Sequence, residues 1–122
     1  DTLVALDGTI YGKPPDAERA RATLTALSGR THRVFSGLAL LAAGETERHS
    51  VVQTEVTFRT ISPPVLDWYL EREEWRGRAG GYAIQGAGGA LVRALHGDYL
   101  SVVGLPLAAL LDLEPGLLPP NR

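Results

Sequence analysis

Two neighbouring stretches of alternating and β-branched residues constrain the fold of this chain most. They cover residues 31–43 and 49–60 and are separated by a short polar connection. In the second stretch Val52, Thr54 and Val56 share one face of a strand, because successive side chains point to opposite faces of a sheet. The pattern predicts a long antiparallel hairpin with one buried face.

Two amphipathic helices are predicted on either side of this hairpin. Asp16 is a suitable N-cap for the first helix, which should end at Gly29, and Ser62 precedes the second helix, with Pro63 at its first position. Apolar residues at helical spacing mark the side of each helix that we expect to be buried. They are Ala17, Ala20, Leu24 and Leu27 in the first helix and Val65, Leu66, Tyr69 and Leu70 in the second.

Shorter elements are predicted at both ends of the chain. Residues 2–6 and 9–11 should be two strands joined by a turn at Asp7-Gly8, and the prolines of 12–15 require a loop after them. Near the other end, two apolar runs predict strands at 90–97 and 99–104.

The last predicted element is a helix over residues 105–113, begun by Pro106. Residues 114–122 have the composition of a tail. The order of elements predicts an α/β fold, with a mixed sheet, flanking helices and the long antiparallel hairpin. We expect residues 1–113 to form a single domain.

Charge and composition limit the classes of partner. The chain has a net charge of −2 and a pI of about 5.9, so it has no basic stripe for polymeric nucleic acid and no polybasic segment for anionic lipid. No apolar run reaches the roughly 18 residues that a membrane span requires. We therefore expect neither polymeric nucleic acid nor a membrane as a partner, and the cytoplasm is the expected compartment.

The beginning of the chain is unusual. The sequence contains no methionine and opens directly on an apolar strand, so we expect a further N-terminal segment to precede Asp1 in the natural protein. Cysteine is also absent, which excludes thiolate chemistry and cysteine–zinc sites within these residues. His32, His49 and His96 have no metal-ligand spacing.

The glycine-rich segment 79–89 raises the question of what its backbone must approach so closely. It lacks the third glycine of a dinucleotide-binding fingerprint, and Lys13 lacks the Walker pattern around it. A small polar set remains: Asp1, Thr2, Lys13 and Gln85. Carboxylate and ammonium groups suit phosphate chemistry, and an amide can read the edge of a nucleobase. The alternative is a surface ion pair and a glutamine that bonds its own loop.

Several motifs resemble the Maf family of nucleoside triphosphate pyrophosphatases. They are "DTLVALDGTIYGKPP", "TEVTFRTIS", "EWRGRAGGYAIQGAGG" and "VVGLPL", and they occur in matching order over residues 1 to about 111. The resemblance implies a Maf/ITPase-like fold and an often dimeric cytoplasmic enzyme. Such an enzyme cleaves a nucleoside triphosphate to the monophosphate and pyrophosphate with a divalent metal, Mg²⁺ or Mn²⁺. The apolar residues of the long hairpin could serve a homodimer.

The resemblance also assigns residue roles. It implies that Asp1 accepts a proton from the attacking water or holds the metal, and that Lys13 contacts phosphate. Thr2 and Gln85 match the two positions that set base preference. Threonine and glutamine there imply dTTP or UTP as substrate, whereas acidic residues are typical of the 7-methyl-GTP branch.

Two departures from the family pattern leave alternatives open. The strand and the serine- and arginine-bearing loop with which the family begins are not in this sequence, and Arg78 stands where the family usually has lysine. An inactive nucleotide-binding regulator of cell division is one alternative. A house-cleaning pyrophosphatase of broad specificity is the other.

Overall fold

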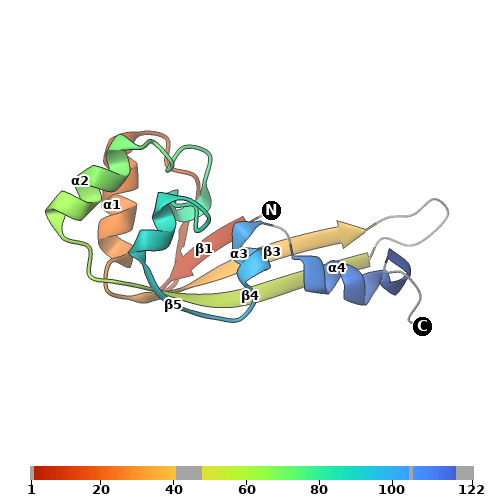
Figure 1. Ribbon diagram of the computed structural model, residues 1–122. Helices are drawn as coiled ribbons and strands as arrows, with labels where there is room; N and C mark the ends of the chain where they lie inside the picture. The colour runs from red at the N-terminus through yellow and green to blue at the C-terminus, as the bar shows by residue number, and fades with distance from the viewer. Residues whose placement is uncertain (1, 41–47, 105, 118–122) are drawn as a thin grey trace.

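An antiparallel sheet of five strands organises the fold (Figure 1). The computed structural model describes residues 2–40, 48–104 and 106–117. The strands lie in the order β2-β1-β3-β4-β5, and every pairing among these residues is antiparallel. Their bounds are β1 (Thr2–Leu6), β2 (Thr9–Tyr11), β3 (Thr31–Leu40), β4 (Arg48–Phe58) and β5 (Val92–His96). The predicted α/β class with flanking helices is confirmed, whereas the sheet, predicted to be mixed, is antiparallel throughout the described residues.

The long hairpin is formed by β3 and β4, as the alternation predicts. Its register runs from the pair Thr31 and Thr57 to the pair Leu40 and Arg48. Thr54 and Val56 are buried and Glu55 is exposed, so the pattern of period two assigned the two faces correctly. The predicted continuation of the first strand over residues 41–43 lies outside the described residues.

The turn between β1 and β2 also has the predicted form. Asp7 and Gly8 both adopt positive φ, 49° and 79°. Two consecutive positive φ angles are typical of the type I′ turn that joins two strands with a right-handed twist. β1 thus pairs with β2 on one side and with β3 on the other.

Helices α1 (Ala17–Leu27) and α2 (Pro63–Glu71) lie side by side at one end of the sheet (Figure 1). The side chain of Asp16 caps α1 by accepting a hydrogen bond from the backbone N–H of Arg19 at 2.8 Å. The buried residues of the two helices are Ala20, Leu24, Leu27, Leu66, Tyr69 and Leu70. The other two predicted core positions are wrong: Ala17 and Val65 are exposed, because each lies in the first turn, beyond the edge of the core.

The predicted strand over residues 99–104 is instead a short helix, α3 (Tyr99–Val103). Asp98 Oδ1 accepts hydrogen bonds from the backbone N–H groups of Leu100 and Ser101, at 3.0 and 3.4 Å. Gly104, with a φ of 113°, ends the helix by donating its N–H to the carbonyls of its last turn. These two caps outweigh the β propensity of the valines.

The last helix, α4 (Leu107–Leu113), agrees with the prediction, and a short turn over Pro115–Leu117 follows it. α4 packs against β3 and β4, where the Arg48 guanidinium contacts the carbonyl of Leu113 and the Glu114 carboxylate. None of the helices in the described ranges is both long and apolar enough to cross a membrane.

Candidate functional site

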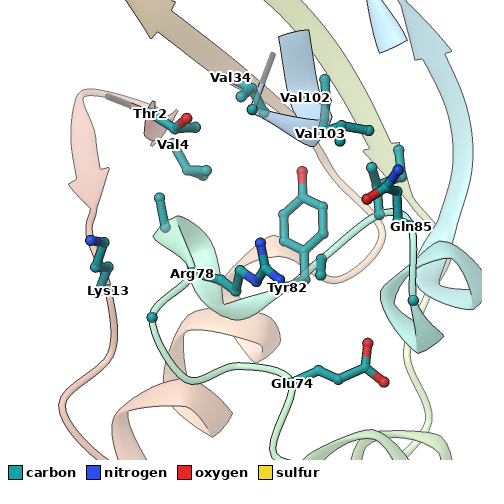
Figure 2. Close-up of a pocket in the computed structure, with 16 residues that line it drawn as sticks. Thr2, Val4, Lys13, Val34, Glu74, Arg78, Tyr82, Gln85, Val102 and Val103 are labelled. Carbon is teal, nitrogen blue, oxygen red and sulfur yellow. The ribbon is translucent and has the colours of Figure 1, made fainter. Parts of the chain in front are cut away.

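A cavity of about 540 Å³ opens between the start of β1, the loop that bears Lys13, the glycine-rich segment and the end of α3 (Figure 2). Its volume falls within the range typical of small-molecule sites. Cationic, amide and apolar side chains all line it (Figure 2). The side chains that line it include those of Thr2, Lys13, Glu74, Arg78, Tyr82, Gln85, Val102 and Val103.

Lys13 is held at the cavity by contacts of its own loop. The carbonyl of Gly12 accepts a hydrogen bond from the N–H of Gly80 at 3.1 Å. Pro14 is buried, and a Cβ added to Gly81 would lie 3.3 Å from its ring. The proline-fixed loop and the glycine-rich segment, far apart in sequence, therefore form one wall.

The first part of the glycine-rich segment packs closely on β1 and α2. Gly80 and Gly81, in the 3₁₀ turn η1 (Ala79–Gly81), have positive φ angles of 72° and 79°. A Cβ at Gly80 would lie 2.9 Å from the side chain of Val4, so glycine is required for both conformation and space. From α2, the Tyr69 hydroxyl donates to the carbonyl of Gly81 at 3.0 Å, and burial raises the pKa of Tyr69 to about 12.

Gln85 lies at the tip of a tight turn in the same segment. The N–H of Gly86 donates to the carbonyl of Ala83 at 3.2 Å. A Cβ on Gly88 would come within 2.3 Å of the same carbonyl oxygen. The glycines at 80 and 88 therefore let the chain pack against itself, while Gly86 lines the cavity beside Gln85.

Two exposed cations lie at the cavity, Lys13 on its proline-fixed loop and Arg78 on the segment that leads to Tyr82. Lys13 and Arg78 both line it, and neither forms an ion pair within the described ranges (Figure 2). The amide of Gln85 likewise makes no hydrogen bond to another described residue. These groups can accept an anionic ligand that also carries donors and acceptors, because no contact within the described chain competes for them.

Another part of the lining is apolar. It includes Val102 and Val103 at the end of α3 and the ring of Tyr82 (Figure 2). The Tyr82 hydroxyl lies 2.7 Å from Nε2 of the buried His32, and Phe58 packs edge-on against both rings. Burial lowers the pKa of His32 to about 4, which leaves its ring neutral near pH 7.

The structure places three of the four candidate residues at this cavity. Thr2, Lys13 and Gln85 all line it, with Thr2 and Gln85 on opposite sides of Tyr82 (Figure 2). Asp1, the predicted catalytic carboxylate and candidate metal ligand, lies outside the described residues. Its sequence neighbour Thr2 is the first described residue of the wall.

Sequence reasoning missed other residues of this site. Glu74 lies in the charged run "EREEWRGR", which reads as a solvated surface, and Arg78 was recognised only as a departure from a family pattern. The valines at 102 and 103 were assigned to a strand. The sequence does offer one signal for Glu74, because the next residue is the large apolar Trp75. A tryptophan that is buried, as Trp75 is, indicates that the charged run does not lie wholly in solvent.

The described residues of the cavity offer few metal ligands. Within the described ranges no group of three or more histidine, aspartate or glutamate side chains could hold a metal ion. Glu74 is the one carboxylate among the described lining residues, and its oxygens accept from the backbone N–H of Ala87 at 3.0 and 3.3 Å. These residues do not form a metal site of their own.

Fold and cavity together define an α/β protein with a pocket suited to an anionic ligand of nucleotide size. Residues 1–114 match the family described as Maf-like protein, and the chain belongs to this family.

The chain is similar to curated proteins named dTTP/UTP pyrophosphatase. It is 44% identical over 113 residues to that of Pyrococcus furiosus, covering 93% of this chain and 59% of the relative. It is 53% identical over 107 residues to that of Myxococcus xanthus, covering 88% of this chain and 54% of the relative. A third, from Latilactobacillus sakei, is 44% identical over 108 residues, with 88% and 59% covered. The chain thus spans less than two thirds of the length of these relatives.

Proposed function

We propose that the protein is a nucleoside triphosphate pyrophosphatase that hydrolyses dTTP and UTP to the monophosphate and pyrophosphate. The observation that carries the proposal is the joint placement of Lys13, Arg78 and Gln85 around one cavity. Cations that form no ion pair among the described residues suit the triphosphate, and an amide that has no partner there suits a base. The relatives named dTTP/UTP pyrophosphatase support this reading.

In the proposed reaction, water attacks the α-phosphorus. The bond from this phosphorus to the oxygen that bridges it to the β-phosphorus breaks, and pyrophosphate leaves with that oxygen. Lys13 and Arg78 stabilise the negative charge that moves onto the leaving group. We propose Asp1 as the acceptor of the proton from water and Thr2 with Gln85 as the groups that face the base.

A divalent cation, Mg²⁺ or Mn²⁺, belongs to the proposal as part of the substrate complex. Mg²⁺ is commonly held by one or two carboxylates together with substrate phosphates, so a complete protein cage is not required. The described residues form no metal site of their own. We also propose a cytoplasmic homodimer, on the resemblance to the family.

The first test concerns Lys13. We expect Lys13→Met to lower kcat/KM for dTTP by about 10- to 100-fold, because it removes one charge-assisted contact to phosphate. Lys13→Arg should retain part of the activity, since it keeps the charge but changes the geometry. Arg19→Met, at an exposed position that does not line the cavity, is the matched control. Pyrophosphate release measures all three, and equal rates for Lys13→Met and wild type would contradict the assignment.

The second test concerns Gln85. An uncharged pyrimidine with a carbonyl at position 4 needs a donor from the protein, which the amide supplies and a carboxylate does not. The 7-methylguanine base carries a positive charge, which a carboxylate favours. We therefore expect Gln85→Glu to change the ratio of kcat/KM for dTTP to that for 7-methyl-GTP by about tenfold or more, in favour of 7-methyl-GTP.

The same assays separate the alternative functions. Tight binding of dTTP without pyrophosphate release would identify an inactive nucleotide-binding regulator. Similar kcat/KM values for all nucleoside triphosphates would indicate a house-cleaning enzyme of broad specificity. Either result would overturn the proposed dTTP/UTP activity.

A further inference from the structure

Glu74 makes an unusual contact with the turn that presents Gln85. Its two carboxylate oxygens lie 3.0 and 3.3 Å from the backbone nitrogen of Ala87, the first residue of the 3₁₀ helix η2 (Ala87–Leu91). An N–H at the start of a helix has no partner within the helix, so a carboxylate there satisfies it. Glu74 thus caps η2 from a segment thirteen residues earlier.

The glycine next to Gln85 is explained by the same carboxylate. A Cβ on Gly86 would lie 1.9 Å from Glu74 Oε1, so the carboxylate would have to leave this position if residue 86 carried a side chain. The φ of Gly86 is −99°, which lies outside the left-handed region that favours glycine. The absent side chain at 86 therefore provides the space through which the carboxylate reaches the N–H of Ala87.

Two hydrogen bonds hold the backbone on either side of Gln85. Before it, the Tyr69 hydroxyl holds the carbonyl of Gly81 at 3.0 Å. After it, Glu74 holds the N–H of Ala87. The amide of Gln85 itself has no partner in the described part of the chain, so these backbone contacts decide where it lies in the cavity.

We propose that Glu74 is a positioning residue for base recognition, which acts by capping η2 and so fixing the turn that carries Gln85. This inference rests on the proposed function for the role of Gln85. Glu74 lines the same cavity, yet its carboxylate is engaged by backbone and does not need to touch the ligand.

The test compares Glu74→Ala, Glu74→Gln, Gly86→Ala and the double variant in the natural full-length protein. Glu74→Ala removes the cap, and Gly86→Ala expels the carboxylate by occupying its place. Each should reduce the dTTP-to-7-methyl-GTP ratio of kcat/KM by about tenfold, as loss of one charged hydrogen bond allows. Glu74→Gln keeps an acceptor oxygen and should remain within about threefold of wild type.

The double variant gives the sharpest readout. If the clash is with the carboxylate, Gly86→Ala should have little further effect once Glu74 is alanine, so the two changes should not add. Glu71→Ala, at an exposed position on α2 that does not line the cavity, is the control and should match wild type. Additive effects of Glu74→Ala and Gly86→Ala would overturn the proposed contact.

Hydrogen exchange separates this inference from the proposed function. The Ala87 N–H should exchange about tenfold faster in Glu74→Ala than in wild type, whichever nucleotide is hydrolysed. Unchanged exchange would overturn the inference directly. If exchange rises and Gln85→Glu alters specificity while Glu74→Ala does not, the capping is real but the positioning role is wrong. If Gln85→Glu leaves specificity unchanged, the proposed base reading fails, and the positioning role fails with it.

Discussion

Gly88→Ala is expected to destabilise the protein by about 3 kcal/mol or more. The added Cβ would lie 2.3 Å from the carbonyl oxygen and 2.9 Å from the carbonyl carbon of Ala83. Both are backbone atoms, so no side chain can rotate away, and the turn that carries Gln85 must open. A urea titration followed by circular dichroism should show a midpoint about 1–2 M lower than that of wild type.

Gly37→Ala is the matched control for this prediction. Gly37 lies within β3, and a Cβ there would meet nothing within 4 Å. Alanine at this position should be neutral or slightly stabilising, because glycine weakens a strand interior. Equal midpoints for the two variants would show that the close packing of Gly88 on Ala83 does not exist in solution.

Local patterns predicted most of the fold because they have a fixed period or a fixed turn chemistry. The alternation in β4 assigned Thr54 and Val56 to the buried face, and Asp7-Gly8 predicted the turn between β1 and β2. α3 was missed because five residues are too few to show a helical period. Its conformation depends on the cap at Asp98. In the sequence alone, an aspartate at this position is equally typical of a turn between two strands.

The site was only partly predictable, for a different reason. Lys13 and Gln85 were recognisable as chemically useful residues, but no local pattern shows that a proline-fixed loop and a turn 72 positions later share one cavity. Glu74 was not recognisable, because a carboxylate in a charged run is usually solvated. Its role depends on the space left at Gly86, and that space is a property of the folded chain.

His32 links the stability of this core to pH. Its ring is fully buried between Phe58 and Tyr82, and Nε2 lies 2.7 Å from the Tyr82 hydroxyl. Burial lowers the pKa of His32 from 6.5 to about 4 in the folded protein. Unfolding exposes the ring, so between these two pH values the unfolded chain binds a proton that the folded chain does not.

The free energy of unfolding should therefore be insensitive to His32 above about pH 7 and fall as the pH drops from 6.5 towards 4, by about 3 kcal/mol in total. Below the folded pKa both states are protonated, and this contribution is fully lost. Urea titrations at about pH 7.5, 6.5, 5.5 and 4.5, in equal steps over most of the window, measure the slope. His32→Gln should be less stable at neutral pH but should lose much less stability on acidification, because an amide does not titrate. His96→Gln, which removes an exposed imidazole on β5, should keep the slope of wild type. If His32→Gln and wild type lost stability in parallel, the acid sensitivity would originate in other groups and His32 would not be held neutral by burial.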